Sequence, residues 1–266
     1  MTIFYFTATG NSFAVAKKIG GTSRSGSSFL SIPQVVSNSH LHFKDDVIGL
    51  VFPVYGLGLP EMVRAFLKKA TWEADYAFAV GTYGCLPGAA ARNVQRFIRK
   101  QGNRLDYAQS LLMVDNFLPG FDIGDQIAKI PRKQTDAHLA QITVDIQNRK
   151  PLDAKACFFW RVASVVMKQG ERTVMGSKQG QRYIVNGSCV KCGVCAKVCP
   201  AGNIAVTERV AFGDQCERCL SCLHLCPKNA IHMRNEKSAA RWRHPEVSLS
   251  EIIAANNRSR CEQPEA

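Results

Sequence analysis

The sequence predicts an α/β protein in two parts, a doubly wound parallel five-stranded sheet followed by a small α+β domain. Residues 1–150 alternate short, strongly apolar stretches with stretches of helical spacing, which is typical of a parallel sheet with helices on both faces. Residues 189–227 carry one cysteine pattern twice, and nothing in the first 150 residues resembles it. A chain of 266 residues has room for both parts.

Five apolar stretches are expected to form the sheet. The first is almost wholly apolar, as a strand buried on both faces should be. Helices are expected between the strands, where apolar residues recur at helical spacing. The expected strands are Thr2–Thr7, Phe29–Ile32, Val47–Val54, Tyr76–Thr82 and Arg104–Val114, and the expected helices are Phe13–Gly20, Glu61–Ala70, Ala89–Lys100 and Arg132–Arg149.

The rest of the chain is less regular. A helix near residues 154–169 is expected to lead into a stretch rich in Gly, Lys and Arg, which has no periodicity and marks a boundary. A short helix is expected near the end, at Ser248–Asn256, but the sequence assigns the tail no role. The expected domains are the sheet domain at 1–150, a helix and basic connector at 151–182, a cysteine-rich domain at 183–235 and a tail at 236–266.

Composition suits a protein with a substantial core and no membrane span. The chain is 46% hydrophobic and 21% charged. It has no run of about 18 uncharged apolar residues, and its first residues do not resemble a signal peptide, so a cytoplasmic location is expected. The formal charge of +13 is spread evenly over both halves. An even spread favours acidic protein partners or anionic substrates over a dedicated nucleic-acid arm.

Eight of the eleven cysteines form an internal duplication. Each repeat has the spacing C-x2-C-x2-C-x3-C-P, and every cysteine recurs 27 positions later. Two-cluster ferredoxins use this run, with the fourth cysteine of each repeat crossing to the other iron–sulfur cluster. On that rule one [4Fe-4S] cluster is held by Cys189, Cys192, Cys195 and Cys226, and the other by Cys199, Cys216, Cys219 and Cys222. Short strands are expected after each loop, at Ile204–Val206 and Ile231–Met233.

Zinc and disulfides explain this pattern less well. Zinc sites use paired cysteines and leave the third and fourth members of each repeat without a purpose. Disulfides require an oxidising compartment, whereas a cytoplasmic location is expected for this chain. Among the other candidates, His224 is expected to be a polar neighbour of a cluster, not a ligand, and Cys85 a small loop residue. Cys157 is expected to lie in the core.

The loop after the first strand, residues 7–12, combines hydroxyl side chains, a glycine and the start of a helix. Such a loop suits a phosphate dianion, although a simple helix cap is an equal alternative from the loop alone. Two further loops follow strands of the same sheet, at 53–60 and 82–88, and the carboxyl ends of parallel strands are where open α/β sheets bind ligands.

The stretch from Ile3 to Ala16, which reads IFYFTATGNSFAVA, resembles the FMN-phosphate fingerprint of flavodoxins. Ser12 stands where threonine is usual and keeps the hydroxyl. The resemblance implies that the loops at 53–60 and 82–88 flank the flavin ring, with Tyr55 and Tyr83 stacking on it. The FMN-binding residues that it implies are Thr7, Ala8, Thr9, Gly10, Asn11, Ser12, Pro53, Tyr55, Gly56, Gly58, Thr82, Tyr83 and Gly84.

Over residues 1–235 the chain is similar to the flavodoxin–ferredoxin fusion proteins, which join a flavodoxin-like FMN domain to a bacterial two-cluster ferredoxin domain. The resemblance implies FMN and two [4Fe-4S] clusters. The leading hypothesis is therefore an electron-transfer protein that works between an external low-potential carrier, the clusters and FMN. The expected partner is a redox protein such as an acidic ferredoxin, with a small-molecule acceptor as a further candidate. No nucleic acid is expected to bind, and no membrane span is expected.

Two other functions stay open. The first is an FMN-dependent reductase of a small molecule, for which the sequence names no catalytic residue. The second is a regulatory or nucleic-acid-binding iron–sulfur protein. Electrons are expected to run from the clusters to FMN, because of charge. Residues 1–150 hold 17 basic and 11 acidic side chains, a net +6, and a positive field stabilises reduced flavin. The basic residues expected to supply this field are Arg64, Lys68, Lys69, Arg92 and Arg96.

Overall fold

A computed structural model describes residues 1–24, 26–160, 162–163 and 182–258. Five parallel strands form the main sheet in the order β2-β1-β4-β6-β7. Taken in chain order this is 2-1-3-4-5, the strand order of flavodoxin-like sheets, and it confirms the expected fold class. The strands are β1 (Thr2–Tyr5), β2 (Ser28–Ser31), β4 (Val47–Pro53), β6 (Tyr76–Tyr83) and β7 (Tyr107–Leu112).

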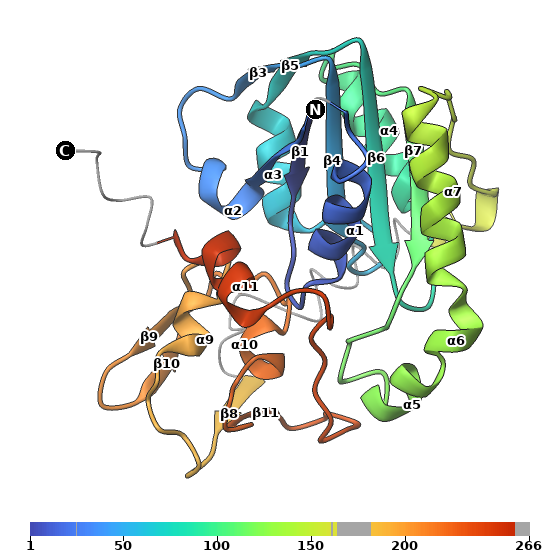
Figure 1. The fold of residues 1–266 in the computed structure, drawn as a ribbon. Helices are drawn as coiled ribbons and strands as arrows, with labels where there is room; N and C mark the ends of the chain where they lie inside the picture. Colours follow the sequence, from blue (N-terminus) through green and yellow to red (C-terminus); the bar gives the residue numbers. More distant parts are fainter. Residues whose placement is uncertain (25, 161, 164–181, 259–266) are drawn as a thin grey trace.

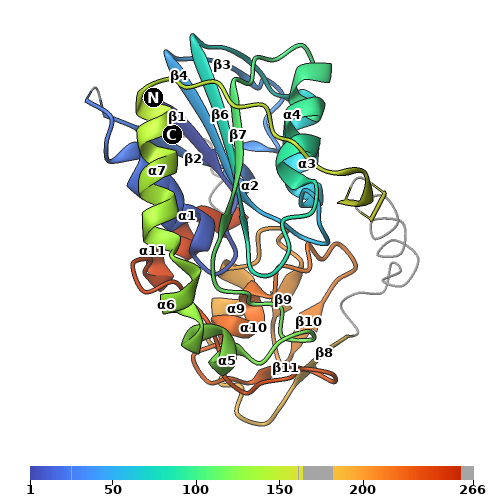
Figure 2. The same cartoon turned by 90° about the vertical axis from the view of Figure 1, so that its right-hand side faces the viewer.

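Helices cover both faces of this sheet (Figures 1 and 2). Two of them, α1 (Asn11–Gly20) and α7 (Thr135–Gln147), pack with alternate residues of the strands in one apolar cluster. The helices α3 (Glu61–Lys69) and α4 (Ala90–Lys100) pack with the remaining residues of the same strands in a second cluster. Because side chains alternate along a strand, a sheet covered on both faces needs the nearly continuous apolar runs seen in β4 and β6.

The predicted helix Arg132–Arg149 was wrong at its start. The chain reaches it through α5 (Ile123–Ala128) and α6 (Ile130–Lys133), and Gln134 then adopts a left-handed conformation with φ 49°. A left-handed residue breaks the helical path, so α7 begins only at the next residue. The sequence also did not predict helix α2 (Ile32–Val35) or the parallel pair formed by β3 (His42–Lys44) and β5 (Thr71–Glu73).

The cysteine-rich part folds as two similar halves. Strand β9 (Ile204–Val206) pairs with β10 (Val210–Phe212), and β11 (Ile231–Met233) pairs with β8 (Tyr183–Val185), both antiparallel. A one-turn helix lies in each half, α9 (Val194–Lys197) and α10 (Ser221–His224). The residue before each helix is left-handed: Gly193 has φ 75°, and Leu220, which is 27 positions later, has φ 59°. The duplication in sequence is therefore also a duplication in backbone conformation.

The C-terminal tail crosses back to the sheet domain. Its helix α11 (Leu249–Asn256) begins with a capping box between Ser248 and Glu251 and packs into the same cluster as α1. Lys17 of α1 donates to the Glu251 carboxylate at 2.8 Å. The tail, to which the sequence assigned no role, thus holds the two parts together, as Figure 1 shows.

Other expectations have mixed outcomes. Seven of the sixteen residues of the predicted helix at 154–169, and nearly all of the Gly-, Lys- and Arg-rich stretch after it, lie outside the described residues. Cys157 is exposed, so its placement in the core was wrong, because residues 154–157 run as extended chain beside the sheet domain. None of the helices in the described ranges is long and apolar enough to span a membrane.

Candidate functional site

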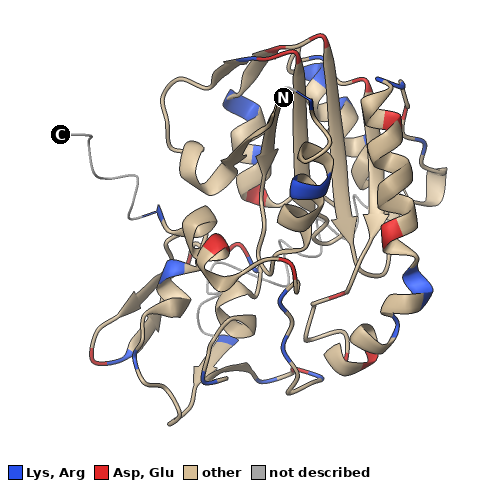
Figure 3. Ribbon diagram, viewed as in Figure 1, with Lys and Arg blue, Asp and Glu red and all other residues tan. Residues whose placement is uncertain are grey.

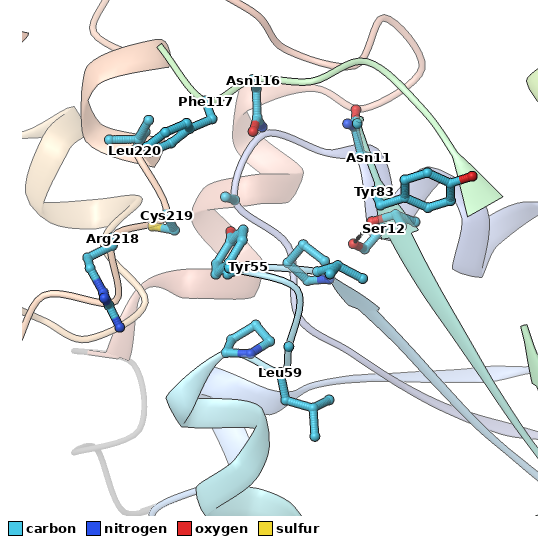
Figure 4. A pocket seen from close by; sticks show the side chains of 18 of the residues that line it. Asn11, Ser12, Tyr55, Leu59, Tyr83, Asn116, Phe117, Arg218, Cys219 and Leu220 are labelled. Atoms are coloured by element: carbon cyan, nitrogen blue, oxygen red, sulfur yellow. Dashed lines mark hydrogen bonds between the residues drawn. The ribbon is translucent and has the colours of Figure 1, made fainter. Parts of the chain in front are cut away.

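A cavity of about 760 Å³ lies where the carboxyl ends of the central strands meet the cysteine-rich part. It is lined by the loops that follow β1, β4, β6 and β7, and also by residues 216–220 of the second cysteine loop (Figure 4). Its volume is in the range of a cofactor or ligand site. Of the residues expected to bind FMN, twelve line it: Thr7, Ala8, Thr9, Asn11, Ser12, Pro53, Tyr55, Gly56, Gly58, Thr82, Tyr83 and Gly84.

The loop after β1 is shaped to receive an anion. No side chain caps the N-terminus of α1, so the structure does not favour the helix-cap alternative. The first N–H groups of an α-helix have no partner within the helix and carry the positive end of its dipole. The hydroxyl oxygens of Thr7 and Thr9 accept hydrogen bonds from Gly10 N, at 3.2 Å, and Asn116 Nδ2, at 2.6 Å. Because both oxygens act as acceptors, their O–H groups remain available to donate to a phosphate.

Gly10 does not line the cavity; it faces the tail. Its φ of 102° is a left-handed conformation that favours glycine, and a Cβ there would lie 2.9 Å from His244 Cβ. The tail also bonds the loop directly: His244 N donates to Thr9 O at 2.8 Å, and Trp242 Nε1 donates to Asn11 Oδ1 at 2.8 Å. The conformation of the anion loop therefore depends on residues more than 230 positions away.

The loop after β4 makes a tight turn at residues 55–58. Tyr55 and Gly58 exchange two backbone hydrogen bonds, of 3.1 and 2.9 Å, and the two residues between them have positive φ. This turn places the Tyr55 ring in the cavity wall, facing Cys219 (Figure 4). The Tyr55 hydroxyl is buried and has no hydrogen-bond partner among the residues that the structure describes. Burial, with the nearby Cys219 and Glu217, raises the pKa of Tyr55 well above its usual value, so it stays a neutral donor.

The loop after β6 is fixed by a buried lysine. Lys133 donates to Gly84 O at 3.1 Å, Met113 O at 2.5 Å and Gln126 Oε1 at 3.0 Å. Burial lowers the pKa of Lys133. Gly84 packs so closely against Asp115 that a Cβ would overlap the Asp115 backbone. Tyr83, the last residue of β6, also lines the cavity, and the preceding Thr82 hydroxyl is hydrogen-bonded to the Ser12 hydroxyl at 2.8 Å.

The part of the cavity wall that the described residues form is not positively charged, whereas the sequence predicted a positive field from residues 1–150. Figure 3 shows Lys and Arg scattered over both parts of the chain, with Asp and Glu among them. Among the described residues, the charged side chains of the wall are three acidic and two basic ones, Glu61, Asp115, Glu217, Arg64 and Arg218. Of the five basic residues expected to act on the flavin, Arg64 lines the described wall and the other four do not. Burial raises the pKa of Asp115 and of Glu217, which moderates their charge but does not make the wall positive. The charges of the described wall therefore give no support for a direction of electron flow.

The eight motif cysteines gather into two sets of four, and these are the sets that the crossing rule predicts. The outer quartet, Cys189, Cys192, Cys195 and Cys226, borders one cavity of about 20 Å³. The inner quartet, Cys199, Cys216, Cys219 and Cys222, borders a second of about 20 Å³. Cys216 and Cys219 of the inner quartet also line the large cavity, whereas Cys192 of the outer quartet is exposed.

The chemistry of both quartets suits an iron–sulfur cluster better than a single ion. Within the described ranges, no three His, Cys, Asp or Glu side chains are arranged to hold one metal ion. Burial raises the pKa of Cys219 and Cys222 well above its usual value, so these thiols need a cationic centre to become thiolates. Backbone N–H groups already point at three of the sulfurs, with N–S distances of 3.3 Å at Cys199, Cys216 and Cys226.

His224, which was expected to be a polar neighbour of a cluster, makes a structural contact between the two parts. Its Nδ1 accepts from Trp242 N at 3.1 Å, which leaves Nε2 to donate to Asn116 O at 2.7 Å. Burial lowers the pKa of His224 to about 4. The neighbouring Ser221 hydroxyl donates to Ala8 O at 2.8 Å. These residues support the site. From the sequence, Asn116 was left open between an edge of the flavin pocket and a plain turn, because its only signal was that it follows a strand of the sheet. Ser221 and Trp242 were missed.

Comparison with known proteins identifies the cysteine-rich part. The family described as 4Fe-4S binding domain matches residues 182–205. Pyruvate synthase subunit PorD of Methanocaldococcus jannaschii is 45% identical over 83 residues, which cover 29% of this chain and 96% of that protein. One component of the ion-translocating oxidoreductase complex of Methanosarcina acetivorans is 48% identical over 48 residues, 17% of this chain. The match spans only 18% of that component's length.

Solved structures were also compared with the whole chain. A flavoprotein from Bacteroides uniformis has a TM-score of 0.33 at 15% identity and covers 42% of this chain and 89% of its own. The Trp repressor binding protein from Bacillus subtilis has a TM-score of 0.33 at 10% identity, with 53% and 99% covered. Both TM-scores are too low to support a fold assignment, so the fold of the first part rests on its strand order.

Proposed function

Because this chain belongs to the flavodoxin–ferredoxin fusion proteins, we propose that it transfers electrons between a redox protein, two [4Fe-4S] clusters in its cysteine quartets and an FMN in its large cavity. One observation carries the proposal. The loops that match a flavodoxin's FMN site and the loop that carries Cys216 and Cys219 line the same cavity. A flavin there would lie next to the inner quartet.

The residues divide into three roles. The loop at 7–12 would hold the phosphate with helix N–H groups and the hydroxyls of Thr7 and Thr9. The loops at 53–58 and 82–84 would enclose the ring, with Tyr55 on the side of Cys219 and Tyr83 on the side of Ser12. When bound, clusters exchange single electrons and a flavin takes up two, so the combination links one-electron and two-electron chemistry.

The exposure of the two cysteine quartets, not charge, supports a direction of electron flow. The outer quartet has the exposed Cys192, whereas the inner quartet has no exposed member and borders the large cavity. We therefore expect an external carrier to meet the outer quartet first, with the flavin site as the inner end. Both relatives are named as parts of larger assemblies, which supports a protein as the carrier.

Cofactor analysis tests the proposal. After anaerobic purification we expect about one non-covalent FMN and about eight irons per chain. Zinc in place of iron, or fewer than about six irons after reconstitution, would contradict the two-cluster assignment. Flavin that is absent even after incubation with excess FMN would contradict the cavity assignment.

Replacing Thr9 with valine tests the phosphate loop. The hydroxyl is buried and would donate a charge-assisted hydrogen bond, which contributes about 1.5–3 kcal/mol. We expect FMN affinity to fall roughly 10- to 100-fold. Riboflavin, which has no phosphate, should lose much less, and Thr22→Val, an exposed site at the end of α1, should leave both affinities unchanged. Equal losses for FMN and riboflavin would mean that the loop does not hold the phosphate.

A second candidate function, reduction of a small molecule at the flavin, is favoured by the extent of the cavity. The cavity continues past the ring loops to Arg64, Asn93 and Phe97 on α3 and α4. A bulky Asn93→Phe change would fill that end. If a small molecule is the acceptor, its reduction should slow in this variant while electron transfer to a protein acceptor does not change.

A further inference from the structure

The two cysteine loops have the same backbone but different surroundings. Lys191 and Arg218, 27 positions apart, have φ values of 55° and 56°. Beside Arg218, Glu217 is packed against the sheet domain, where its carboxylate accepts hydrogen bonds from the backbone N–H groups of Glu61 and Met62. Val190, the counterpart of Glu217, is 59% exposed. One copy of the loop is thus an internal interface, and the other copy faces solvent.

The residues after the fourth cysteine of each repeat follow the same division. Pro200 is buried, and Ala201 packs against the apolar cluster under α3 and α4. Their counterparts, Pro227 and Lys228, are exposed. The cysteine-rich part therefore uses one of two equivalent surfaces to contact the sheet domain. The second, which we call the outer surface, consists of Val190, Lys191, Cys192, Pro227 and Lys228.

The outer surface combines an apolar centre with basic residues. Lys191 and Lys228 border the outer quartet's cavity, and neither has an ion-pair partner within the described part of the chain. Val206 and Val210 also border that cavity, so the hairpin turn between them, with exposed Arg209 and Glu208, lies beside it. The local charge is positive: three basic residues and one acidic residue. An apolar patch with a cationic rim suits a partner with an acidic rim.

We propose that the outer surface docks an acidic redox protein, in the way that the equivalent inner surface docks the chain's own sheet domain. This inference rests on the proposed electron-transfer function. Each encounter moves one electron from the reduced partner to the outer quartet's site and leaves the partner oxidised by one electron, with no proton or group transferred. A second copy of this chain is a poor occupant, because two chains of formal charge +13 repel each other.

Charge reversal at the outer surface tests the proposal in the reconstituted full-length protein. The probe is an acidic two-cluster ferredoxin, reduced beforehand and mixed with the oxidised protein by anaerobic stopped flow. We expect Lys191→Glu with Lys228→Glu to slow the second-order reaction at least roughly 10-fold at low salt, and the loss should shrink as salt screens the interaction. Reduction by dithionite, which needs no docked protein, should not change.

Lys100→Glu is the matched control, because it makes the same kind of charge change at an exposed position at the far end of α4. An equal loss in this control, or no loss in the double variant, would overturn the proposal. So would a wild-type protein that dithionite reduces but the acidic ferredoxin does not. If dithionite fails too, the proposed function itself is wrong. A dimer in sedimentation experiments that the double variant abolishes would make a second copy the occupant instead.

Discussion

Replacement of Cys199 by alanine is expected to remove about half of the iron, from about eight to about four atoms per chain. In sequence, Cys199 belongs to the first repeat. In space, it borders the inner quartet's cavity with Cys216, Cys219 and Cys222. Loss of one of four thiolates leaves a cluster with an open ligand position, and the other quartet keeps all its members. The cluster that survives should therefore be the outer one.

Cys226→Ala is the matched variant, because it removes the crossing ligand of the outer quartet. Both variants should lose similar amounts of iron, but only Cys199→Ala should alter the absorbance of bound flavin, since only the inner quartet borders the large cavity. Cys157→Ala, at an exposed cysteine outside the motif, should keep all the iron. A flavin change in Cys226→Ala and none in Cys199→Ala would show that the two quartets are assigned the wrong way round.

Gly84→Ala is expected to abolish most FMN binding. A Cβ at Gly84 would overlap the backbone of Asp115, which cannot move aside as a flexible side chain can. The loop after β6 and the loop after β7 are both held by Lys133, which donates to Gly84 O in the first and to Met113 O in the second. A shift of one loop therefore strains the other. Overpacking costs about 3 kcal/mol at the upper end of its usual range, which corresponds to a loss of affinity of about 100-fold. Flavin titration of the apoprotein measures this loss.

Gly187→Ala is the control for this change, because a Cβ at Gly187 would meet no atom within 4 Å. It should bind FMN as the wild type does. Iron content reports whether the cysteine-rich part of Gly84→Ala is intact, because both quartets belong to that part and Gly84 does not. Wild-type FMN affinity in Gly84→Ala, with iron retained, would mean that this loop does not enclose the ring.

The sequence predicted the sheet well because its signals are local. Doubly buried strands such as β4 and β6 must be continuously apolar, and a duplicated cysteine spacing requires no knowledge of the fold. The break before α7 was missed because Gln134 takes up its left-handed conformation for tertiary reasons that its residue type does not reveal. Cys157 was placed in the core from its apolar neighbours, which in the structure are exposed, as Phe158 is at 74%.

The supports of the candidate site could not be predicted, because they come from distant segments. Trp242 and His244 bond the anion loop across more than 230 residues, and no motif marks either of them. The positive charge expected near the flavin is not found in the described part of the cavity wall, for a related reason. Charge counted along the sequence does not show which side chains face the cavity, and there Glu61, Asp115 and Glu217 outnumber Arg64 and Arg218.

Anaerobic reductive titration of the reconstituted protein tests the central claim most directly. Electrons are added in known amounts, and flavin and iron–sulfur absorbance are followed together. If the outer quartet is the entrance and the large cavity the inner end, the first two electrons per chain should appear on the flavin, and the clusters should be reduced only afterwards. Clusters that become fully reduced while the flavin stays oxidised would contradict the account.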